Sequence, residues 1–453
     1  MSNKQKYERP LIRKLVTGMP NKFGMRTEYQ PLTHIDGARI DELVRDFGSP
    51  LFVLSEATIR RNFRDANIAF STRYPKVQFA WSYKTNYLQS VCNIFHQEGS
   101  WAEVVSRFEY DRALKLMKDP AKIIFNGPDK TRSDIELLIE NSSMIHIDHA
   151  EEMYMLIQVA GEMKKKPRVA IRVNMDTGIY PMWDRFGFNY ENGQAMDAIN
   201  KLISSGVVDF CGLHCHIGTF MLSPDAYSKA VVKLCDLAVK TRQKYNINIQ
   251  YIDLGGGFPS KNTLKGSYLP GSDMNPSIET FAEAITSTLL AQPFKPEELP
   301  LLILETGRAL VDDAGFCISS VIANKRLSDG RRATIIDAGV NILFTSFWYE
   351  HKISPAQPFG NYSEDTVIYG PLCMNIDVIR ENITLPPLSA GDKIVIHHVG
   401  AYNMTQWMQF ITMRPNVVLV DTMGKAHLIR RQETNEDISA MEILPNHLST
   451  SEK

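Results

Sequence analysis

The sequence predicts an α/β protein with two parts, a TIM-like (β/α)8 barrel followed by an all-β domain. Through the first two thirds of its 453 residues, short β-branched or aromatic runs alternate with segments of helical periodicity. After about residue 312 the helical segments fade, and apolar runs are separated by Gly, Pro and Asn, which favours a sandwich-like or barrel-like β domain. The length suffices, because such a barrel takes roughly 250 residues as one unit.

Eight runs in the first part can supply the strands of the barrel, which is the number needed for closure. They are residues 77–84, 101–105, 122–125, 144–148, 168–173, 210–216, 250–254 and 301–305. An earlier apolar run at 51–54 would make nine, so we place it before the barrel, together with the Pro- and charge-rich N-terminal segment. Further strands are expected at 333–337, 365–369, 393–397 and 416–420 in the second part.

These patterns divide the chain into four regions. Residues 1–46 form an N-terminal segment expected to pack on the β domain, and residues 47–312 form the barrel. Residues 313–432 form the β domain, and residues 433–453 a polar tail.

Charge and hydropathy exclude several functional classes. Fifty Lys and Arg against 51 Asp and Glu give a net charge of -1, so no positive field favours nucleic acid or an anionic membrane. No run of eighteen apolar residues is present, and the first ten residues lack the apolar stretch of a signal peptide, so we expect a cytoplasmic protein. The six irregularly spaced cysteines, with no Cys-x-x-Cys, indicate reduced thiols.

Reactive side chains follow the predicted strands at the edge where barrel enzymes bind substrates. Lys84 closes the first strand, and burial would lower its pKa toward that of a nucleophile, although a lysine that reaches the surface is the commoner case. His214 and His216 share one face of the sixth strand. Two such histidines can bind a metal, but no Cys or carboxylate cluster completes the set in the sequence, so we expect no metal site.

The last two strands end in groups suited to a phosphorylated cofactor. Gly255, Gly256 and Gly257 leave backbone N–H groups open to an anion, or simply form a turn. Glu305 and Arg308 follow the eighth strand, where a local ion pair is the plainer interpretation. Together, a lysine, a histidine facing a ring, a glycine cradle and a carboxylate predict one cofactor, pyridoxal 5'-phosphate.

Over roughly residues 35–432 the chain resembles the pyridoxal-phosphate-dependent decarboxylases of the diaminopimelate, ornithine and arginine group, which have the alanine-racemase-like fold type III. Phe-Ala-Trp-Ser-Tyr-Lys84-Thr-Asn is similar to the family's Tyr-Ala-Val-Lys-Ala-Asn, and His216-Ile-Gly-Thr219 to its His-x-Gly-Ser. Glu305-Thr-Gly-Arg308 is similar to Glu-Pro-Gly-Arg. In the second domain, Gly370-Pro-Leu-Cys373 and Gly400-Ala-Tyr402 resemble two further family motifs.

The resemblance implies a role for each matched residue. Lys84 would bond covalently to the cofactor aldehyde, His216 would stack on the pyridine ring, and Cys373 would enter the partner subunit's site to protonate Cα. Glu103 falls where the family usually has Asp. The residues implied in cofactor binding are Lys84, Glu103, Arg172, His216, Thr219, Gly255, Gly256, Gly257, Glu305, Gly307, Arg308 and Tyr402, and those implied in catalysis are Lys84, His216, Glu305 and Cys373.

The implied reaction is decarboxylation of an amino acid at its α-carbon. A carboxylate such as Glu305 beside the pyridine nitrogen keeps the nitrogen protonated and strengthens the electron sink, whereas the related alanine racemases place an arginine there. A racemase using Lys84 and a tyrosine as opposed bases remains an alternative, as does a non-catalytic cofactor carrier. Glu305 and Cys373 weigh against the first, and the whole β domain weighs against the second.

The sequence departs from the family where the far end of the substrate binds. Thr345 and Met374 stand where diaminopimelate enzymes carry Arg and Glu, so we expect a substrate whose distal group is amidated, acylated, differently charged or carried on a larger scaffold. The family builds its sites at a dimer interface, which implies a homodimer with shared sites here. Substrate contacts are expected from Arg308, Thr345, Tyr349, Met374 and Tyr402.

Overall fold

The computed structural model describes residues 31–267, 269–360 and 362–448, and the first part of this chain is a closed barrel of eight parallel strands. Closure is shown by pairing of the last strand with the first, β12 with β4, and by the pairing of β10 with β8. The eight predicted runs are therefore confirmed as the barrel strands. These are β4 (Val77–Ser82), β5 (Trp101–Val104), β6 (Ile123–Phe125), β7 (Met144–Ile147), β8 (Arg168–Asn174), β10 (Asp209–His214), β11 (Tyr251–Asp253) and β12 (Leu301–Leu304).

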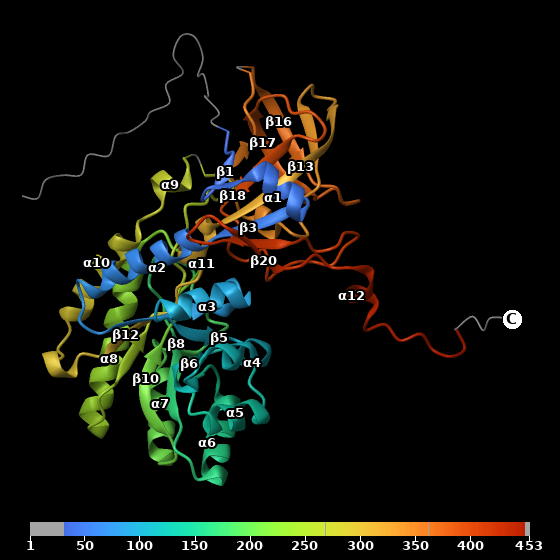
Figure 1. Cartoon of the computed structure of the whole chain (residues 1–453). Coiled ribbons are helices and arrows are strands. Elements are labelled where there is room, and N and C mark those ends of the chain that lie inside the picture. Colours follow the sequence, from blue (N-terminus) through green and yellow to red (C-terminus); the bar gives the residue numbers. More distant parts are fainter. Residues whose placement is uncertain (1–30, 268, 361, 449–453) are drawn as a thin grey trace, which may run out of the picture.

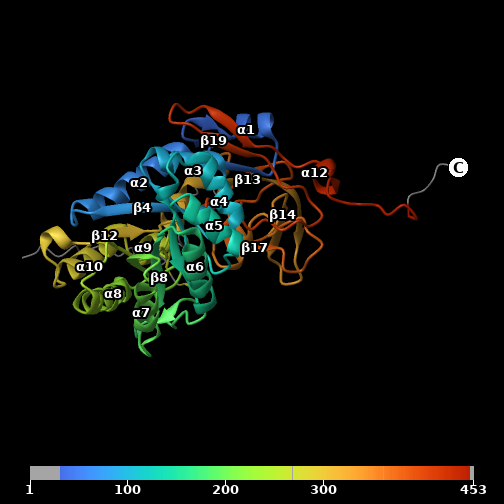
Figure 2. The same ribbon diagram turned by 90° about the horizontal axis from the view of Figure 1, so that it is seen from below.

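Helices surround the barrel strands on the outside (Figures 1 and 2). Their apolar faces pack on strands that are buried along nearly their whole length, as expected for a parallel sheet covered by helices. Side-chain caps fix several helix starts; Thr131, for example, forms a capping box with Asp134. The surrounding helices are α2 (Glu56–Ser71), α3 (Gln89–Gln97), α4 (Arg107–Leu116), α5 (Arg132–Glu140), α6 (Ala150–Met163), α7 (Gln194–Ser205), α8 (Pro224–Tyr245) and α10 (Ile278–Leu290).

The second part is a nine-stranded, mostly antiparallel sheet system, drawn at the top of Figure 1. Its long strand β13 pairs with β14, β18 and β3, and so joins the two ends of the sheet. The all-β second domain predicted from the sequence is confirmed. Its later strands are β13 (Gly315–Arg326), β14 (Arg332–Ile336), β15 (Ile353–Pro355), β16 (Glu364–Tyr369), β17 (Val378–Leu385), β18 (Lys393–His397), β19 (Val417–Val420) and β20 (Ala426–Arg430).

Strand β3 (Leu51–Ser55) belongs to this second sheet although it precedes the barrel in sequence. It is fully buried between β13, which it pairs antiparallel, and β19, which it pairs in parallel. The run at 51–54 therefore lies outside the barrel, as expected, and the boundary at residue 47 falls too early because it assigns β3 to the barrel part. Helix α1 (Ile40–Phe47) packs on the same sheet through Ile40 and Leu43, whereas residues 1–30 of the predicted N-terminal segment lie outside the described residues.

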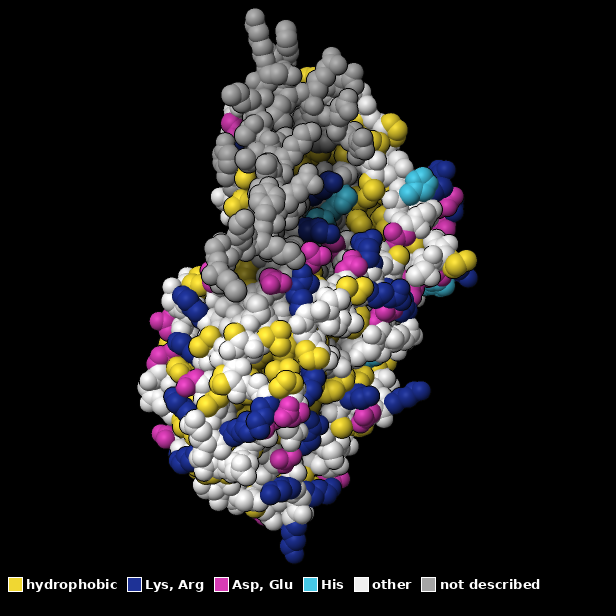
Figure 3. Space-filling model, turned by 90° about the vertical axis from the view of Figure 1, so that its left-hand side faces the viewer, with side chains coloured by type: hydrophobic (Ala, Val, Ile, Leu, Met, Phe, Trp, Pro, Cys, Tyr) yellow, Lys and Arg dark blue, Asp and Glu magenta, His cyan; other side chains and the backbone are white. Residues whose placement is uncertain are grey.

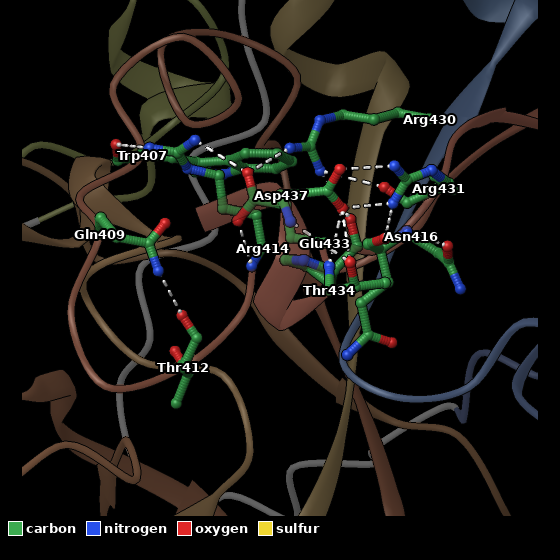
Figure 4. A network of polar contacts seen from close by, with 12 residues as sticks. Trp407, Gln409, Thr412, Arg414, Asn416, Arg430, Arg431, Glu433, Thr434 and Asp437 are labelled. Carbon is green, nitrogen blue, oxygen red and sulfur yellow. Dashed lines mark hydrogen bonds and ion pairs between the residues drawn. The ribbon is translucent and has the colours of Figure 1, made fainter. Parts of the chain in front are cut away.

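The start of the predicted polar tail is fixed to the β domain by charged side chains (Figure 4). Glu433 accepts hydrogen bonds from Arg414 and Arg430, and the Arg430 guanidinium lies 4.6 Å from the centre of the Trp407 ring. Helix α12 (Asn435–Ser439) follows, and the chain then extends away from the body in Figures 1 and 2. The last residues of the tail, 449–453, lie outside the described part.

Charged side chains of both signs are interspersed on the face shown in Figure 3, in keeping with the balanced composition. Within the described part of the chain, no helix combines the length and apolar character required to cross a membrane.

Candidate active site

A cavity of about 840 Å³ opens at the C-terminal ends of the barrel strands, where the sequence placed its candidate residues. A second cavity, of about 620 Å³, lies beside α2 and α10, and no predicted site residue is among the described residues that line it. The predicted residues lining the first cavity are Lys84, Arg172, His216, Thr219, Glu305, Arg308, Tyr349 and Tyr402.

Lys84 lies in a 3-10 turn, η1 (Tyr83–Thr85), directly after β4, and it is paired with a buried carboxylate. Its Nζ donates to both oxygens of Glu103, at 2.7 and 2.8 Å, and Glu103 on β5 is fully buried. Burial alone would lower the pKa of Lys84, but the carboxylates of Glu103 and Glu305 outweigh it and raise that pKa. Burial acts in the expected direction, but the net shift is the opposite of the one expected, because the lysine is paired with carboxylates.

Glu305 follows β12 and points its carboxylate at the cavity from an almost fully buried position, 4% exposed. Asn126, which follows β6, donates from Nδ2 to Glu305 Oε1 at 2.7 Å. His214 Nε2 lies 3.4 Å from the other carboxylate oxygen. A carboxylate held in this way can accept a hydrogen bond from a protonated ring nitrogen that lies in the cavity.

His216 is oriented by the glycine turn on the next strand. The Gly256 N–H donates to His216 Nδ1 at 3.1 Å, so Nδ1 is the unprotonated nitrogen of the ring. Burial lowers the pKa of His216 well below its ordinary value, which keeps the ring neutral. The Trp183 ring lies 5.5 Å away, so His216 presents a flat, uncharged ring to the cavity beside a second aromatic group.

The three glycines after β11 occupy positions that no larger residue can fill. A Cβ on Gly256 would lie 2.5 Å from the Glu305 carbonyl oxygen, and one on Gly257 would lie 2.4 Å from the Gly218 oxygen. Gly255 and Gly257 also have positive φ angles, +64° and +96°. The turn therefore packs closely against His216 and the backbone of Glu305, although its glycines are not among the described residues that line the cavity.

Arg308 connects three other predicted residues. Its Nη2 donates to Thr219 Oγ1 at 3.1 Å, its Nη1 donates to the Tyr349 hydroxyl, and its guanidinium lies 4.7 Å from the centre of the Tyr402 ring. The preceding Gly307 packs against Thr85, where a Cβ would lie 2.1 Å from Thr85 Oγ1. The group combines positive charge with hydroxyls at one side of the cavity.

Arg172 on β8 reaches the cavity from another side. Its Nη1 lies 3.5 Å from Asp148 Oδ1, and its guanidinium lies 4.3 Å from the centre of the Phe186 ring. Burial lowers its pKa, although a guanidinium remains charged at any ordinary pH.

Three predicted residues of the second domain lie apart from this cavity. The Thr345 hydroxyl is buried and bonded to His351 Nε2 and Asn403 Oδ1, each at 2.9 Å, so Thr345 does not offer the substrate contact we expected. Cys373 is exposed between β16 and β17, and Met374 packs on the edge of the main core. Neither is among the described residues that line the cavity.

The residues present fit pyridoxal phosphate. A lysine, a flat neutral ring and a buried carboxylate line one space large enough for a small ligand, and the glycine turn packs against His216 and the backbone of Glu305. Sequence reasoning missed several lining residues, of which Asn126 carried a usable signal, since it directly follows a barrel strand. Others come from loops and turns: Trp183, Arg185, Phe186, Phe220, Trp348 and Gln406.

Comparison with known proteins decides the family. Residues 56–312, more than half of the chain, match the family model described as pyridoxal-dependent decarboxylase, pyridoxal binding domain. The chain belongs to this family. The fold type III resemblance is thereby confirmed, and the cofactor of this decarboxylase is pyridoxal phosphate.

The similarity of this decarboxylase to its relatives extends over both domains. The diaminopimelate decarboxylase of Methanocaldococcus jannaschii is 32% identical, with 91% of this chain and 95% of the relative covered. That of Bacillus subtilis is 27% identical, with 90% and 95% covered. The crystal structure of the M. jannaschii enzyme has a TM-score of 0.84 and 31% identity, covering 92% of this chain and 96% of its own.

A more distant structure, a lysine/ornithine decarboxylase from Vibrio vulnificus, has a TM-score of 0.71 at 21% identity and shares the fold. This chain is accordingly a carboxy-lyase that acts on the α-carbon of an amino acid. The relatives give the racemase and carrier alternatives no support.

Proposed function

We propose that this decarboxylase acts as a homodimer on an α-amino acid whose distal end differs from that of diaminopimelate. The observation that carries the proposal is the division of the site: the cofactor-type residues of the barrel line one cavity, while Cys373 lies exposed outside it. A reaction that needs a proton donor at Cα then draws it from a second chain.

Each barrel residue has a task set by its position. Lys84 provides the amine for covalent attachment, and Glu103 holds that amine at 2.7 Å while it is free. His216 would cover one face of the cofactor ring, and the Glu305 carboxylate would accept a hydrogen bond from the protonated ring nitrogen. The glycine turn, with Thr219 and Tyr402, binds the phosphate.

Bound pyridoxal phosphate supplies an acceptor for the electron pair left on Cα when carbon dioxide departs. The protein orients the bond to be broken and keeps water out. Glu305 keeps its negative charge beside the ring nitrogen throughout. With its amine free, Lys84 would hold a proton beside Glu103.

The cavity itself supports a substrate that is not diaminopimelate. Its outer wall includes the aromatic rings of Trp183, Phe220 and Trp348, which favour apolar or flat groups over a doubly charged amino-acid end. Thr345, at the position of the family's distal arginine, is buried and bonded within its own chain. The relatives named above are diaminopimelate decarboxylases, so that compound is the reference substrate for any comparison.

The test is a decarboxylation screen with carbon dioxide release as the readout. The panel contains meso-diaminopimelate, lysine, ornithine, arginine and amino acids with acylated or amidated side chains. We expect release from one of the modified amino acids at a higher kcat/KM than from meso-diaminopimelate. A clear preference for meso-diaminopimelate would contradict the proposed substrate class, and a monomeric active enzyme would contradict the proposed assembly.

A further inference from the structure

A layer of four buried polar side chains crosses the barrel interior at the floor of the cavity. His146 comes from β7, His214 from β10, Asp253 from β11, and Glu305 directly follows β12. One nitrogen or oxygen atom of each lies within 4.8 Å of the others. His214 and Glu305 line the cavity, whereas His146 and Asp253 lie behind them, fully buried.

Much of the hydrogen-bonding capacity of this layer is unused among the described residues. His146 Nδ1, Asp253 Oδ2 and both ring nitrogens of His214 form no hydrogen bond there, although His214 Nε2 lies 3.4 Å from Glu305 Oε2 and His146 Nδ1 lies 4.0 Å from Asp253 Oδ2. The remaining atoms are fixed from outside, since Asp253 Oδ1 accepts from the Gly255 N–H at 2.9 Å and His146 Nε2 lies 3.0 Å from the Tyr251 hydroxyl. Buried polar atoms without partners are costly and uncommon, so four in one layer require an explanation.

Two carboxylates in so small a buried space cannot both be charged unless a cation joins them. Burial and the neighbouring Glu305 raise the pKa of Asp253 well above its ordinary value. Burial lowers the pKa of His146 and of His214 well below the usual value, so neither ring supplies a positive charge.

The cationic side chains near the layer do not act equally on its two carboxylates, Asp253 and Glu305. Lys84 and Arg172 both act on Glu305 from the cavity side. Lys130, beneath His146, is already neutralised by Glu152 at 2.7 Å, and both of these side chains are fully buried. Of the two carboxylates, Glu305 is therefore the one that positive charge stabilises.

Glu103 and Asp148 are the other acidic groups near the layer, and each has its own partner. Glu103 is held by Lys84 at 2.7 Å, and Asp148 lies 3.5 Å from Arg172. Neither offers Asp253 a positive charge, and Glu103 adds to the repulsion that Asp253 experiences.

We propose that His146, His214 and Asp253 are positioning residues that confine one proton to Asp253 and so leave Glu305 as the charged carboxylate of the cavity. The inference rests on the proposed role of Glu305 beside the ring nitrogen. A protonated Asp253 is a hydrogen-bond donor next to Glu305. Together with the Asn126 amide, it makes protonation of Glu305 itself unfavourable. The neutral histidines fill the layer without competing for that proton.

The same four side chains also have the composition of a zinc site, with two imidazoles and two carboxylates. The two interpretations require opposite protonation of Asp253, because a metal ligand must be deprotonated. Metal content is therefore an outcome that the test must include.

The decisive measurement is infrared difference spectroscopy of the full-length protein, with and without cofactor, at about pH 9. At that pH two further buried carboxyls whose pKa burial raises, Glu109 with a pKa of about 7 and Asp312 with a pKa of about 6, are ionised. We expect one protonated-carboxyl band that is absent from Asp253→Asn and present in Glu305→Gln. Glu103→Gln is the matched control and should keep the band.

Loss of the band in Glu305→Gln or Glu103→Gln, with its retention in Asp253→Asn, would overturn the inference. So would the absence of the band in the parent protein together with stoichiometric zinc, or tight Zn²⁺ binding that Asp253→Asn abolishes. These readouts need no turnover. A protein that shows the Asp253 band but decarboxylates no amino acid would contradict the proposed function alone.

Measurements of kcat then distinguish a positioning role of Asp253 from a role in packing alone. Asn at 253 keeps a neutral donor beside Glu305 and Leu does not, so we expect the kcat of Asp253→Leu to lie at least ~10-fold below that of Asp253→Asn with similar KM. Equal kcat values in two folded variants would contradict the role of the donor. If the Leu variant fails to fold, the infrared comparison with Asp253→Asn still decides the position of the proton.

Discussion

The strand ends of the barrel and the loops of the β domain carry equally recognisable motifs, yet the structure uses them differently. Lys84, His216 and Glu305, from three separate strands, line one cavity. Cys373, from the β domain, is exposed and lies outside that cavity. Several motif residues of the barrel therefore line one cavity of a single chain, whereas Cys373 is not among the described residues that line it.

The difference follows from how the two regions are built. Each barrel strand is held on both sides by parallel neighbours, so the residues at the strand ends all point to one rim. The loop between β16 and β17 is fixed mainly by Asp377, which accepts from the backbone N–H groups of Val340 and Leu372 and leaves Cys373 facing outward.

The largest expected effect is that of Lys84→Ala. Removing the amine eliminates covalent attachment of the cofactor, and we expect kcat/KM to fall by at least ~10³-fold. Borohydride reduction followed by peptide mapping of the parent protein should place the cofactor on Lys84. Lys229→Ala, on the exposed face of α8, is the control and should retain activity. An adduct on another lysine would contradict the whole assignment of the site.

Glu305→Gln should leave cofactor bound and slow decarboxylation by at least ~10²-fold, equivalent to about 2.7 kcal/mol of transition-state stabilisation. The amide keeps the shape of the side chain and can still contact Asn126, but it removes the charge that holds the ring nitrogen protonated. Steady-state kinetics, with bound cofactor measured by absorbance, check both parts. An unchanged kcat would mean that the ring nitrogen has another partner.

The barrel could be predicted from the sequence because its strands are buried on both faces and appear as short apolar runs. β3 shows the limit of that signal, since Leu51-Phe-Val-Leu is as apolar as any barrel strand and yet pairs with β13 and β19. The apolar character of a run indicates that the strand is buried, but it does not indicate which sheet the strand joins. That choice depends on contacts with residues more than 250 positions away along the chain.

The site shows the same limit at the level of single residues. Lys84, His216 and Glu305 were predictable because strand ends converge, and the direction of the pKa shift at Lys84 was not, because it depends on the distance to Glu103. Thr345 was expected at the substrate on the basis of its position in the motif alone. Its burial and its bonds to His351 and Asn403 arise from packing within the β domain.

We expect a smaller effect in substrate preference, which depends on two residues of the β domain. Thr345 and Met374 leave a charged distal group without partners, and losing one partner of a buried charged pair typically costs ~2–5 kcal/mol. We therefore expect meso-diaminopimelate to be at least ~30-fold poorer than the true substrate in kcat/KM. A kcat/KM for meso-diaminopimelate above about 10⁴ M⁻¹s⁻¹ would show that other residues bind its distal end.

The smallest effect, and the most direct test of the contrast between the two regions, is a mixing experiment. Lys84→Ala and Cys373→Ala proteins are each expected to be nearly inactive, since each lacks one residue in every site. In a mixed homodimer with shared sites, one site combines both substitutions and the other is intact. Random exchange makes half of the dimers mixed, so mixing equal amounts should restore about a quarter of the parent activity. Exchange is followed independently with differently tagged subunits. If mixed dimers form and no activity returns, Cys373 does not act across the interface, and the exposed loop between β16 and β17 needs another explanation.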